Sequence, residues 1–535
     1  MILVGSNLAE TMPPSLRFLT ELKENGGTLV VIDPRRTKTA EQADLHLAPR
    51  PGTDLALALG LLHLVIAEGR VDEEYVQERT VGWEDARAAA MAHWPEYVER
   101  ITGVSVPQLR ETVRLFCEPE SAMVLTARGP EQQSKGTDTV GAWINLCLAT
   151  GRAGRPLSGY GCLTGQGNGQ GGREHGQKAD QLPGYRKLDD PAARAHVAEV
   201  WGVDPDSLPG PGRSAYELLD ALGTDIRSLL LMASNPVVSA PRAAHVEERI
   251  RSLDFLAVCD VVLSETAELA DVVLPVTQWA EETGTMTSLE GRVLLRRQAV
   301  TPPDGVRSDL EVLHELAARL GVEKGFPTGP EEVFEELRRA SAGGVADYSG
   351  ITYRRLVEED GVFWPCPAVE SSHPGDTREQ AHPGTPRLFL DRFATPDGRA
   401  RFVPVSHRAT AEEPDDEYPV LLTTGRVVSQ YQSGAQTRRV AELSAAAPGP
   451  FVELHPRLAA RLGAAEGDPV AVVSRRGRAV APARITSAIR PDTVFMPFHW
   501  PGEGRANSLT NPALDPTSRM PEFKTCAVRL EAVRP

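Results

Sequence analysis

The sequence lacks closely spaced cysteines. Its 535 residues include six cysteines, and none belongs to a Cys-x-x-Cys pair: Cys117, Cys147, Cys162, Cys259, Cys366 and Cys526. Zinc sites and iron–sulfur clusters need thiolates at short spacings, so neither kind of motif is visible here. Scattered free thiols are typical of a reducing compartment, and we therefore expect a cytoplasmic protein.

An excess of basic residues is also missing, as is any long apolar run. The formal charge is −16, from 57 basic and 73 acidic residues. Because phosphate binding needs a basic face, this balance argues against nucleic acid as the main partner. The longest apolar run, residues 55–67, is interrupted by Gly60 and His63. It is too short to cross a bilayer, so we expect a buried core helix there and no membrane span.

The clearest positive feature is an internal repeat. Residues 39–44 (Thr-Ala-Glu-Gln-Ala-Asp) match residues 266–271 at five of six positions, with an offset of 227 residues. At nearly the same offset, residues 4–7 resemble residues 232–235, and Asp33 matches Asp260. Each copy is expected to form a strand, a Ser-Asn turn, a helix and a second strand that ends in Asp. A third apolar stretch follows, at 45–48 and at 272–274.

This order of elements is typical of a βαβ unit, which places ligands at the carboxyl ends of its parallel strands. The N–H groups at the start of the helix suit a phosphate, and the acidic residue after the second strand suits ribose or base groups. Neither turn has the Gly-x-Gly-x-x-Gly pattern, so ordinary NAD binding is a poor fit. Two copies predict two nucleotides or one site between two halves. The alternative is a duplicated structural domain without a nucleotide.

Positive charge and glycine are concentrated between the copies. Residues 128–187 contain eight basic and four acidic residues, a local balance of +4, and residues 159–172 are rich in glycine. Glycine allows the backbone to approach a ligand closely, and a basic loop of this kind suits an anion. The alternative is a flexible surface linker.

Five short blocks stand out at residues 5–10, 33–37, 51–54, 233–236 and 290–292. Together and in this order, they resemble the dimethyl-sulfoxide-reductase superfamily of molybdopterin oxidoreductases, most closely its assimilatory nitrate reductases. The resemblance implies an α/β fold with two pseudo-symmetric nucleotide-binding parallel-sheet domains, followed by a C-terminal double-psi β-barrel. The expected boundaries are 1–165 and 166–335 for the two domains, 336–411 for a connecting segment that includes a surface stretch at 365–383, and 412–535 for the barrel.

The resemblance also implies a molybdenum cofactor with two pterin guanine dinucleotides, one for each α/β domain. The residues expected around the first dinucleotide are Gly5, Ser6, Asn7, Glu10, Asp33, Arg35, Gly52, Thr53 and Asp54. Those expected around the second are Asn235, Ser264, Glu265 and Asp309. Arg128 and Gln132 are expected to approach the pterins.

The region from about residue 412 follows a stretch rich in Pro, Glu and Asp. Its pattern predicts a strand at 418–424, a helix at 455–462, and a strand at 467–473 that ends in a turn at 475–477. By resemblance, the residues that close over the pterins are Thr424, Gly425, Arg426, Gln432, Asn507 and Lys524. Without the family, Lys524 would be interpreted as a solvated basic residue.

Two residues are candidates for contact with the substrate. Arg173 follows the glycine-rich run, and a guanidinium can bind a planar oxyanion through two N–H groups; pairing with Glu174 or Asp180 is the alternative. His499 is a candidate for the substrate funnel, with a packed structural histidine as its alternative. The passage 164–186 is similar to cytoplasmic assimilatory nitrate reductases, whereas formate-oxidising relatives usually lack the Arg-Glu pair at 173–174. The resemblance therefore favours nitrate as substrate over formate.

A third possibility is a molybdenum-free electron-transfer scaffold. In the family, the molybdenum ligand and the cysteines of a [4Fe–4S] cluster lie upstream of the turn at residues 5–7, and no residue here is assigned to the metal. Residues 1–5 also look like a strand entering a turn, so we expect the natural N-terminus to lie further upstream and this chain alone to be inactive. The expected partners are a small anion and an electron-donor protein or reductase subunit.

Overall fold

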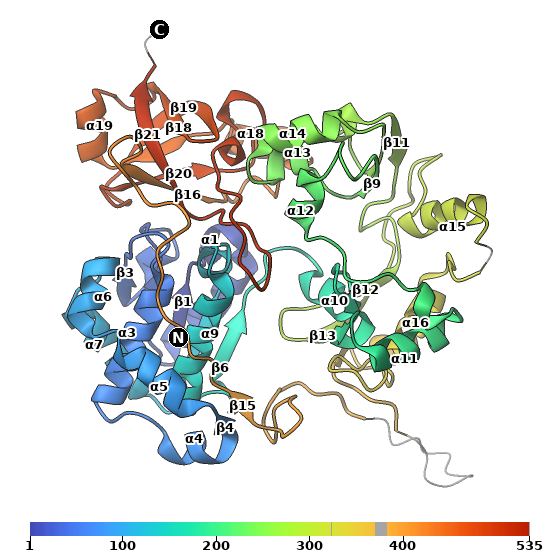
Figure 1. The fold of residues 1–535 in the computed structure, drawn as a ribbon, viewed down its shortest axis with the longest axis horizontal. Coiled ribbons are helices and arrows are strands. Elements are labelled where there is room, and N and C mark those ends of the chain that lie inside the picture. The colour runs from blue at the N-terminus through green and yellow to red at the C-terminus, as the bar shows by residue number, and fades with distance from the viewer. Residues whose placement is uncertain (323, 370–381, 534–535) are drawn as a thin grey trace.

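The computed structural model describes residues 1–322, 324–369 and 382–533, and Figure 1 shows how its parts are arranged. The N-terminal unit lies below the C-terminal barrel, and the remaining elements form two groups beside them. One group carries β9, β11, α13 and α14, and the other carries α10, α11, α16, β12 and β13. Most of the stretch 365–383 lies outside the described residues.

A five-stranded parallel sheet forms the centre of the N-terminal unit. Its order is β3-β2-β1-β5-β6, with β1 at Ile2–Val4, β2 at Val30–Ile32, β3 at Leu45–Leu47, β5 at Met123–Thr126 and β6 at Gly159–Cys162. Branched apolar side chains fill β1 and β2, which are fully buried, as in sheets covered on both faces.

The run at 55–67 is the buried helix that the sequence predicts. Helix α3 (Asp54–Ala67) packs against α9 (Gly136–Ala149) and against α5, α6 and α7. Because neighbours surround it, nearly every side chain of α3 is buried and it shows no polar face. The other helices of this unit are α1 (Leu8–Thr11), α2 (Leu16–Glu24), α4 (Glu73–Arg79), α5 (Trp83–Met91), α6 (Pro95–Thr102), α7 (Val106–Cys117) and α8 (Arg128–Glu131).

The repeat is confirmed as a structural duplication. The second copy is a parallel sheet of order β11-β10-β9, with β9 at Ser228–Met232, β10 at Phe255–Asp260 and β11 at Val272–Pro275. Its helices α13 (Pro236–Ser239) and α14 (Ala243–Arg251) correspond to α1 and α2. The α12 helix (Ala215–Asp220) precedes the sheet and α15 (Asp309–Arg319) follows it.

Matching side chains hold both turns. Asn7 Oδ1 accepts a hydrogen bond from Thr39 Oγ1 at 2.9 Å, and Asn235 Oδ1 accepts one from Thr266 Oγ1 at 2.8 Å. Each threonine hydroxyl also accepts a backbone N–H of the helix after the turn, from Ala9 at 3.0 Å and Val237 at 3.2 Å. One buried threonine therefore connects the turn to the helix in each copy.

A middle unit surrounds the antiparallel sheet β12-β13-β14. Its strands are β12 (Gly284–Thr287), β13 (Arg292–Arg296) and β14 (Val362–Phe363), and its helices are α10 (Gly169–Glu174), α11 (Pro191–Trp201), α16 (Pro330–Ser341) and α17 (Tyr353–Glu358). The short strands β7 (Gln181–Leu182) and β8 (Arg186–Lys187) pair with each other. The expected boundary at 335/336 falls inside α16, and β14 completes the sheet. We therefore propose that the start of the connecting segment belongs to this unit.

The C-terminal region is a closed six-stranded barrel of order β16-β20-β17-β19-β18-β21. Its strands are β16 (Val420–Gly425), β17 (Val452–Leu454), β18 (Pro469–Ser474), β19 (Gly477–Ile485), β20 (Thr493–Pro497) and β21 (Cys526–Ala532), and its helices are α18 (Ala441–Ala446) and α19 (Pro456–Leu462). The predicted strands, the predicted helix and the predicted turn are confirmed within two residues. A separate pair, β15 (Ala400–Arg401) and β4 (Thr80–Val81), joins the connecting segment to the N-terminal unit.

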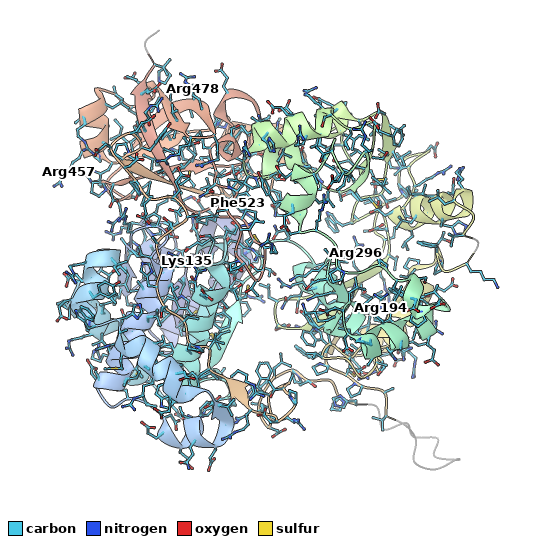
Figure 2. All side chains as sticks on the ribbon, viewed as in Figure 1. Lys135, Arg194, Arg296, Arg457, Arg478 and Phe523 are labelled. Atoms are coloured by element: carbon cyan, nitrogen blue, oxygen red, sulfur yellow. The ribbon has the colours of Figure 1, made fainter. Side chains whose placement is uncertain are left out.

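Buried charges join the N-terminal unit to the barrel. Figure 2 labels Lys135 and Phe523 in this region. Lys135 donates to the carbonyl of Arg408, and desolvation lowers its pKa to about 8. Glu522 accepts from the backbone N–H groups of Ser134 at 2.9 Å and Ala411 at 3.0 Å, so one carboxylate holds three distant segments together.

The duplicated threonines allow a matched test of the turns. We expect Thr39→Val and Thr266→Val each to lower the free energy of unfolding by about 1–3 kcal/mol, because each removes a hydrogen bond to the asparagine of the turn and leaves a helix N–H without its side-chain acceptor. The urea midpoint measures the effect, with Thr20→Val on the exposed side of α2 as the control. Equal midpoints for all three variants would contradict this account of the turns.

Candidate functional site

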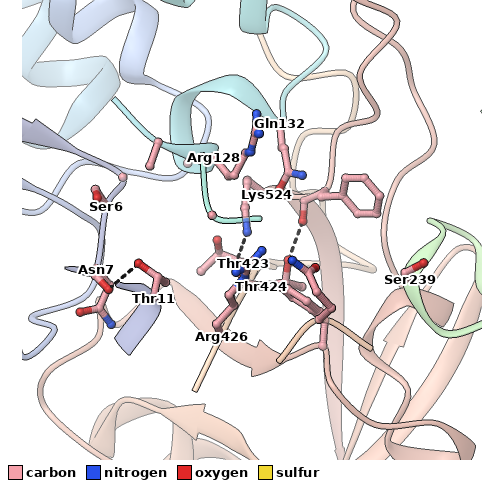
Figure 3. Close-up of a pocket in the computed structure, with 18 of the residues that line it drawn as sticks. Ser6, Asn7, Thr11, Arg128, Gln132, Ser239, Thr423, Thr424, Arg426 and Lys524 are labelled. Atoms are coloured by element: carbon pink, nitrogen blue, oxygen red, sulfur yellow. Dashed lines mark hydrogen bonds between the residues drawn. The ribbon is translucent and has the colours of Figure 1, made fainter. Parts of the chain in front are cut away.

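A cavity of about 640 Å³ lies between the N-terminal unit, the second copy of the repeat and the barrel. Figure 3 shows Ser6, Asn7 and Arg128 from the N-terminal unit facing Thr424, Arg426 and Lys524. The cavity lies where strands β1 and β9 end, as expected for the carboxyl ends of parallel strands.

The first turn brings two backbone segments close together. Gly5 has a φ of +56°, and a Cβ on it would lie 2.7 Å from the Cα of Gly129. A side chain at Gly5 is therefore excluded twice, by conformation and by space. The next residue, Ser6, is buried, and its hydroxyl has no hydrogen-bond partner among the described residues. An unsatisfied hydroxyl beside a cavity suits a polar ligand.

Asp33 and Arg35 lie together but do not form an ion pair. The carboxylate of Asp33 accepts the backbone N–H of Arg35 at 2.9 Å, and burial raises its pKa. The guanidinium of Arg35 instead bonds Glu453 of the barrel at 2.9 Å and lies 3.5 Å from the ring centre of Phe495. Asp33 is thus available as an acceptor, while Arg35 also connects the N-terminal unit to the barrel.

The second turn is tied to the barrel as well. Asn235 lines the cavity and donates to Glu265 at 2.7 Å and to Ser433 at 3.1 Å. Glu265 forms an ion pair with Arg438 of the barrel. Ser264 donates to Asp260 at 2.7 Å, so its hydroxyl is already engaged.

Two cations of the barrel face the cavity without a carboxylate partner. Neither Arg426 nor Lys524 forms an ion pair within the part of the chain that the structure describes, and Lys524 Nζ donates only to the carbonyl of Thr424, at 2.8 Å. Desolvation lowers the pKa of both, to about 7 for Lys524. Half-buried cations are normally paired, so this pair predicts an anionic ligand such as a diphosphate.

His499 is fully buried away from the cavity lining, and both ring nitrogens are occupied. Nδ1 lies 2.6 Å from the carbonyl of Gln432, and Nε2 accepts the backbone N–H of Val427 at 3.0 Å. Desolvation lowers its pKa to about 4, so the ring is neutral at pH 7 and carries its proton on Nδ1. This geometry favours the structural alternative: His499 holds the loop that presents Arg426 and Gln432.

The cavity brings together most of the residues expected from the sequence. Those that line it are Gly5, Ser6, Asn7, Asp33, Arg35, Gly52, Asp54, Arg128, Gln132, Asn235, Thr424, Gly425, Arg426, Gln432, Asn507 and Lys524. Those outside the lining are Glu10, Thr53, Arg173, Ser264, Glu265, Asp309 and His499. Asp309 starts α15, and its buried Oδ1 has no partner among the described residues.

Sequence reasoning missed several lining residues. Asp260 could have been found, because the repeat pairs it with Asp33. Tyr431, Ser433 and Phe498 carry no comparable signal, since barrel loops bring them in from far along the chain.

Arg173 lies on α10, near the cavity but outside its lining. Its guanidinium donates to Gln170, and Gly165 and Gln166 of the same segment line the cavity. Desolvation lowers the pKa of Lys178, and the charges of Arg173 and Arg128 lower it further. The charges of Arg173, Lys178 and Arg128 therefore act on one another, and of these three residues Arg128 lines the cavity.

Comparisons with known proteins agree with this geometry. Residues 1–319 match the family model described as molybdopterin oxidoreductase, and residues 420–527 match the molydopterin dinucleotide binding domain. The chain is 45% identical to the assimilatory nitrate reductase catalytic subunit of Bacillus subtilis, over 99% of this chain and 74% of that protein. It is 39% identical to the F420-dependent formate dehydrogenase subunit alpha of Methanocaldococcus jannaschii, over 100% of this chain and 76% of that protein.

A solved structure shares the fold. Acetylene hydratase from Pelobacter acetylenicus matches with a TM-score of 0.75 and 21% identity, over 99% of this chain and 77% of that one. Among the described residues, no group of three or more His, Cys, Asp or Glu side chains could hold a metal ion. None of the described helices is long and apolar enough to cross a membrane.

The lowered pKa of Lys524 predicts a pH dependence of stability. Below pH 7 both the folded and the unfolded cofactor-free protein bind the proton, and the full cost of burying the charge applies. Between about pH 7 and the ordinary lysine pKa of 10.5, only the unfolded state stays protonated, so stability rises with pH, by up to about 1.4 kcal/mol per unit. Urea unfolding at several pH values should show this rise in the wild type relative to Lys524→Met. Parallel curves would contradict it.

The buried histidine can be tested by removing both of its hydrogen bonds. We expect His499→Phe to lower the free energy of unfolding by about 2–4 kcal/mol, because it leaves the Val427 N–H and the Gln432 carbonyl unpaired. Urea midpoints measure this loss. Unchanged stability with abolished turnover would instead identify His499 as a substrate-contacting residue.

Proposed function

Because the chain belongs to the molybdopterin oxidoreductase family, we propose that it is the cofactor-binding part of a nitrate reductase. Such an enzyme reduces nitrate to nitrite at a molybdenum centre that is held by two pterin guanine dinucleotides. The balanced reaction consumes nitrate, two electrons and two protons and gives nitrite and water. When bound, the cofactor supplies the oxygen-atom transfer and the two-electron chemistry. The chain supplies binding, orientation and charge.

The residues of the cavity fit a dinucleotide cofactor. Arg426 and Lys524 provide positive charge for a diphosphate, and Gly5 and Gly129, which pack closely against each other, both line the cavity. The unpartnered Ser6 hydroxyl and the buried amide nitrogen of Gln432, which has no partner among the described residues, supply further polar groups. Asp33 can accept the amino group of guanine, and the two copies of the repeat supply one half-site each.

The second half-site extends beyond the cavity lining. We assign Asn235 and Asp260 to its near end and Asp309, with its orphaned carboxylate oxygen, to the guanosine end. Ser264 and Glu265 support this site indirectly, because Ser264 bonds Asp260 and Glu265 bonds Asn235. In the first half, the Glu10 carboxylate accepts a hydrogen bond from the Asn7 amide at 3.3 Å, as Glu265 does from Asn235 in the second half. Thr53 is the residue that precedes helix α3.

Arg173 is the observation that carries the choice of nitrate. It follows the segment whose residues Gly165 and Gln166 line the cavity, and a guanidinium can hold a planar oxyanion through two N–H groups. The 45% identity to an assimilatory nitrate reductase supports the same substrate. Formate oxidation is the second candidate, supported by the 39% identity to a formate dehydrogenase; formate is also an anion that arginine can hold.

The electrons come, in this proposal, from a donor protein or a reductase subunit through a [4Fe–4S] cluster of the complete enzyme, in the cytoplasm. A molybdenum-free scaffold remains the alternative if the protein binds no metal.

The test uses the complete enzyme that contains this sequence, loaded with molybdenum cofactor. Reduced viologen with nitrate measures reduction, and oxidised viologen with formate measures the alternative. We expect nitrate turnover, and we expect Arg173→Ala to lower kcat/KM by about 100-fold through the loss of charge-assisted hydrogen bonds worth about 3 kcal/mol.

Arg155→Ala is the matched control. Arg155 belongs to the same basic segment, but it is paired with Asp72 at 2.9 Å on the surface, so its removal should leave turnover unchanged. Formate oxidation without nitrate reduction would overturn the substrate. A metal-free protein without either activity would favour the scaffold.

A further inference from the structure

Helix α10, which carries Arg173, is too short to be stable alone. It has six residues, and helices of that length need tertiary contacts. Strand β12 provides them at both ends of the helix: the backbone N–H of Thr287 donates to Asn168 Oδ1 at 2.9 Å, and its hydroxyl donates to Glu174 Oε2 at 2.8 Å. Figure 1 shows α10 beside β12.

Glu174 is the buried end of this attachment. Glu174 is 1% exposed, and the Oε2 atom that bonds Thr287 also accepts a hydrogen bond from the hydroxyl of Tyr348. The two hydroxyls lie 2.9 Å apart, so Glu174, Thr287 and Tyr348 form a closed triangle. These partners lie 113 and 174 residues away in sequence, and they connect α10 to both the sheet and the α16–α17 region.

A carboxyl group at this place is costly. Tyr348 belongs to an apolar core with Phe334, Val293 and Trp364. Desolvation raises the pKa of Glu174, although the bonds from Tyr348 and Thr287 oppose that rise. An apolar residue would avoid this cost, so the carboxyl group points to a need for a defined geometry rather than for stability alone.

The position that Glu174 defines is that of its neighbour, Arg173. Arg173 precedes Glu174 directly and is half-buried, whereas Glu174 is enclosed in the core of the middle unit. The phenol of Tyr185 lies near both side chains: burial and the charge of Glu174 raise its pKa, and Arg173 acts in the opposite direction. Tyr185 has a φ of +61°, an uncommon backbone conformation that is often associated with functional sites.

We propose that Glu174 is a positioning residue: its hydrogen bonds with Thr287 and Tyr348 fix α10 and thereby hold the Arg173 guanidinium in place for the anionic substrate. This inference rests on the proposed function, because it assumes that Arg173 holds the substrate. Glu174 itself does not touch substrate or cofactor.

The test compares variants of the complete cofactor-loaded enzyme in the viologen assay. Glu174→Leu removes the acceptor at similar volume, and we expect it to raise the KM for nitrate about tenfold while kcat stays within about twofold. Glu174→Gln keeps a carbonyl oxygen for the two hydroxyls and should stay within about threefold of the wild-type KM. Tyr348→Phe removes one bond without emptying the core and should raise KM severalfold.

A double-mutant cycle separates positioning from general stability. In an Arg173→Ala background, Glu174→Leu should raise KM no further, because the side chain that it positions is gone. Asp347→Asn is the matched control: Asp347 is a buried carboxylate of the same unit that bonds the N–H groups of Gly343 and Ser349, and its loss should lower the thermal midpoint without changing KM.

The outcomes distinguish the two proposals. If Arg173→Ala leaves the KM and kcat for nitrate unchanged, the proposed role of Arg173 fails. If Arg173→Ala raises KM while Glu174→Leu does not, or if the two effects simply multiply, only the positioning role of Glu174 is overturned. A Glu174→Leu protein too unstable to assay leaves Tyr348→Phe to decide, and an unchanged KM in that variant would also overturn the role.

Discussion

Unpaired positive charge inside an acidic protein is the constraint on which the rest of the structure depends. Arg426 and Lys524 face the cavity without a carboxylate partner among the described residues, although the chain carries a net charge of −16. Acidic residues are therefore abundant, and Asp33, Asp54 and Asp260 line the same cavity, yet none of them forms an ion pair with either cation. Glu453 bonds Arg35 and Glu265 bonds Arg438, so these two carboxylates are paired with other cations. Such an arrangement is unfavourable until an anion binds, so the barrel must be held firmly against its neighbours.

The duplicated halves provide that support in two different ways. In both copies an asparagine and a threonine fix the turn at the end of the first strand, and this local solution is the same. The contacts with the barrel differ. The first half reaches it through Arg35, after its second strand. The second half reaches it through Glu265, also after its second strand, and in addition through Asn235 at the turn itself. The barrel is thus attached to two similar frames at points that are only partly equivalent. This asymmetry allows one cavity to be shared by two related half-sites.

Local patterns in the sequence are sufficient to predict the elements and the repeat. The apolar run of α3, the strands that end at Asp33 and Asp260, and the hairpin turn at 475–477 all follow from short-range periodicity and turn chemistry. The partners of the site side chains do not. Arg35 meets Glu453 at a separation of 418 residues, and His499 bonds the carbonyl of Gln432, 67 residues before it. Nothing in the local sequence distinguishes a histidine that faces substrate from one that holds a loop. The local sequence also gives no sign that Phe334 of α16 shares a core with residues 293 and 346–366, on both sides of the predicted boundary at 335/336.

The same separation explains how one cofactor frame can serve different substrates. Most of the cavity lining comes from the N-terminal unit, the second repeat copy and the barrel, and Gly165 and Gln166 add to it from the segment before α10. Arg173 lies outside the lining, on the short helix α10 of the middle unit. That helix depends on Thr287 and Tyr348 of its own unit, and neither residue lines the cavity. A change in the middle unit can therefore alter how an anion is held while the charges that face the cofactor stay where they are. In this proposal, substrate choice depends on the three buried side chains of Glu174, Thr287 and Tyr348, which bond one another. The residues that hold the cofactor do not restrict how these three side chains can change.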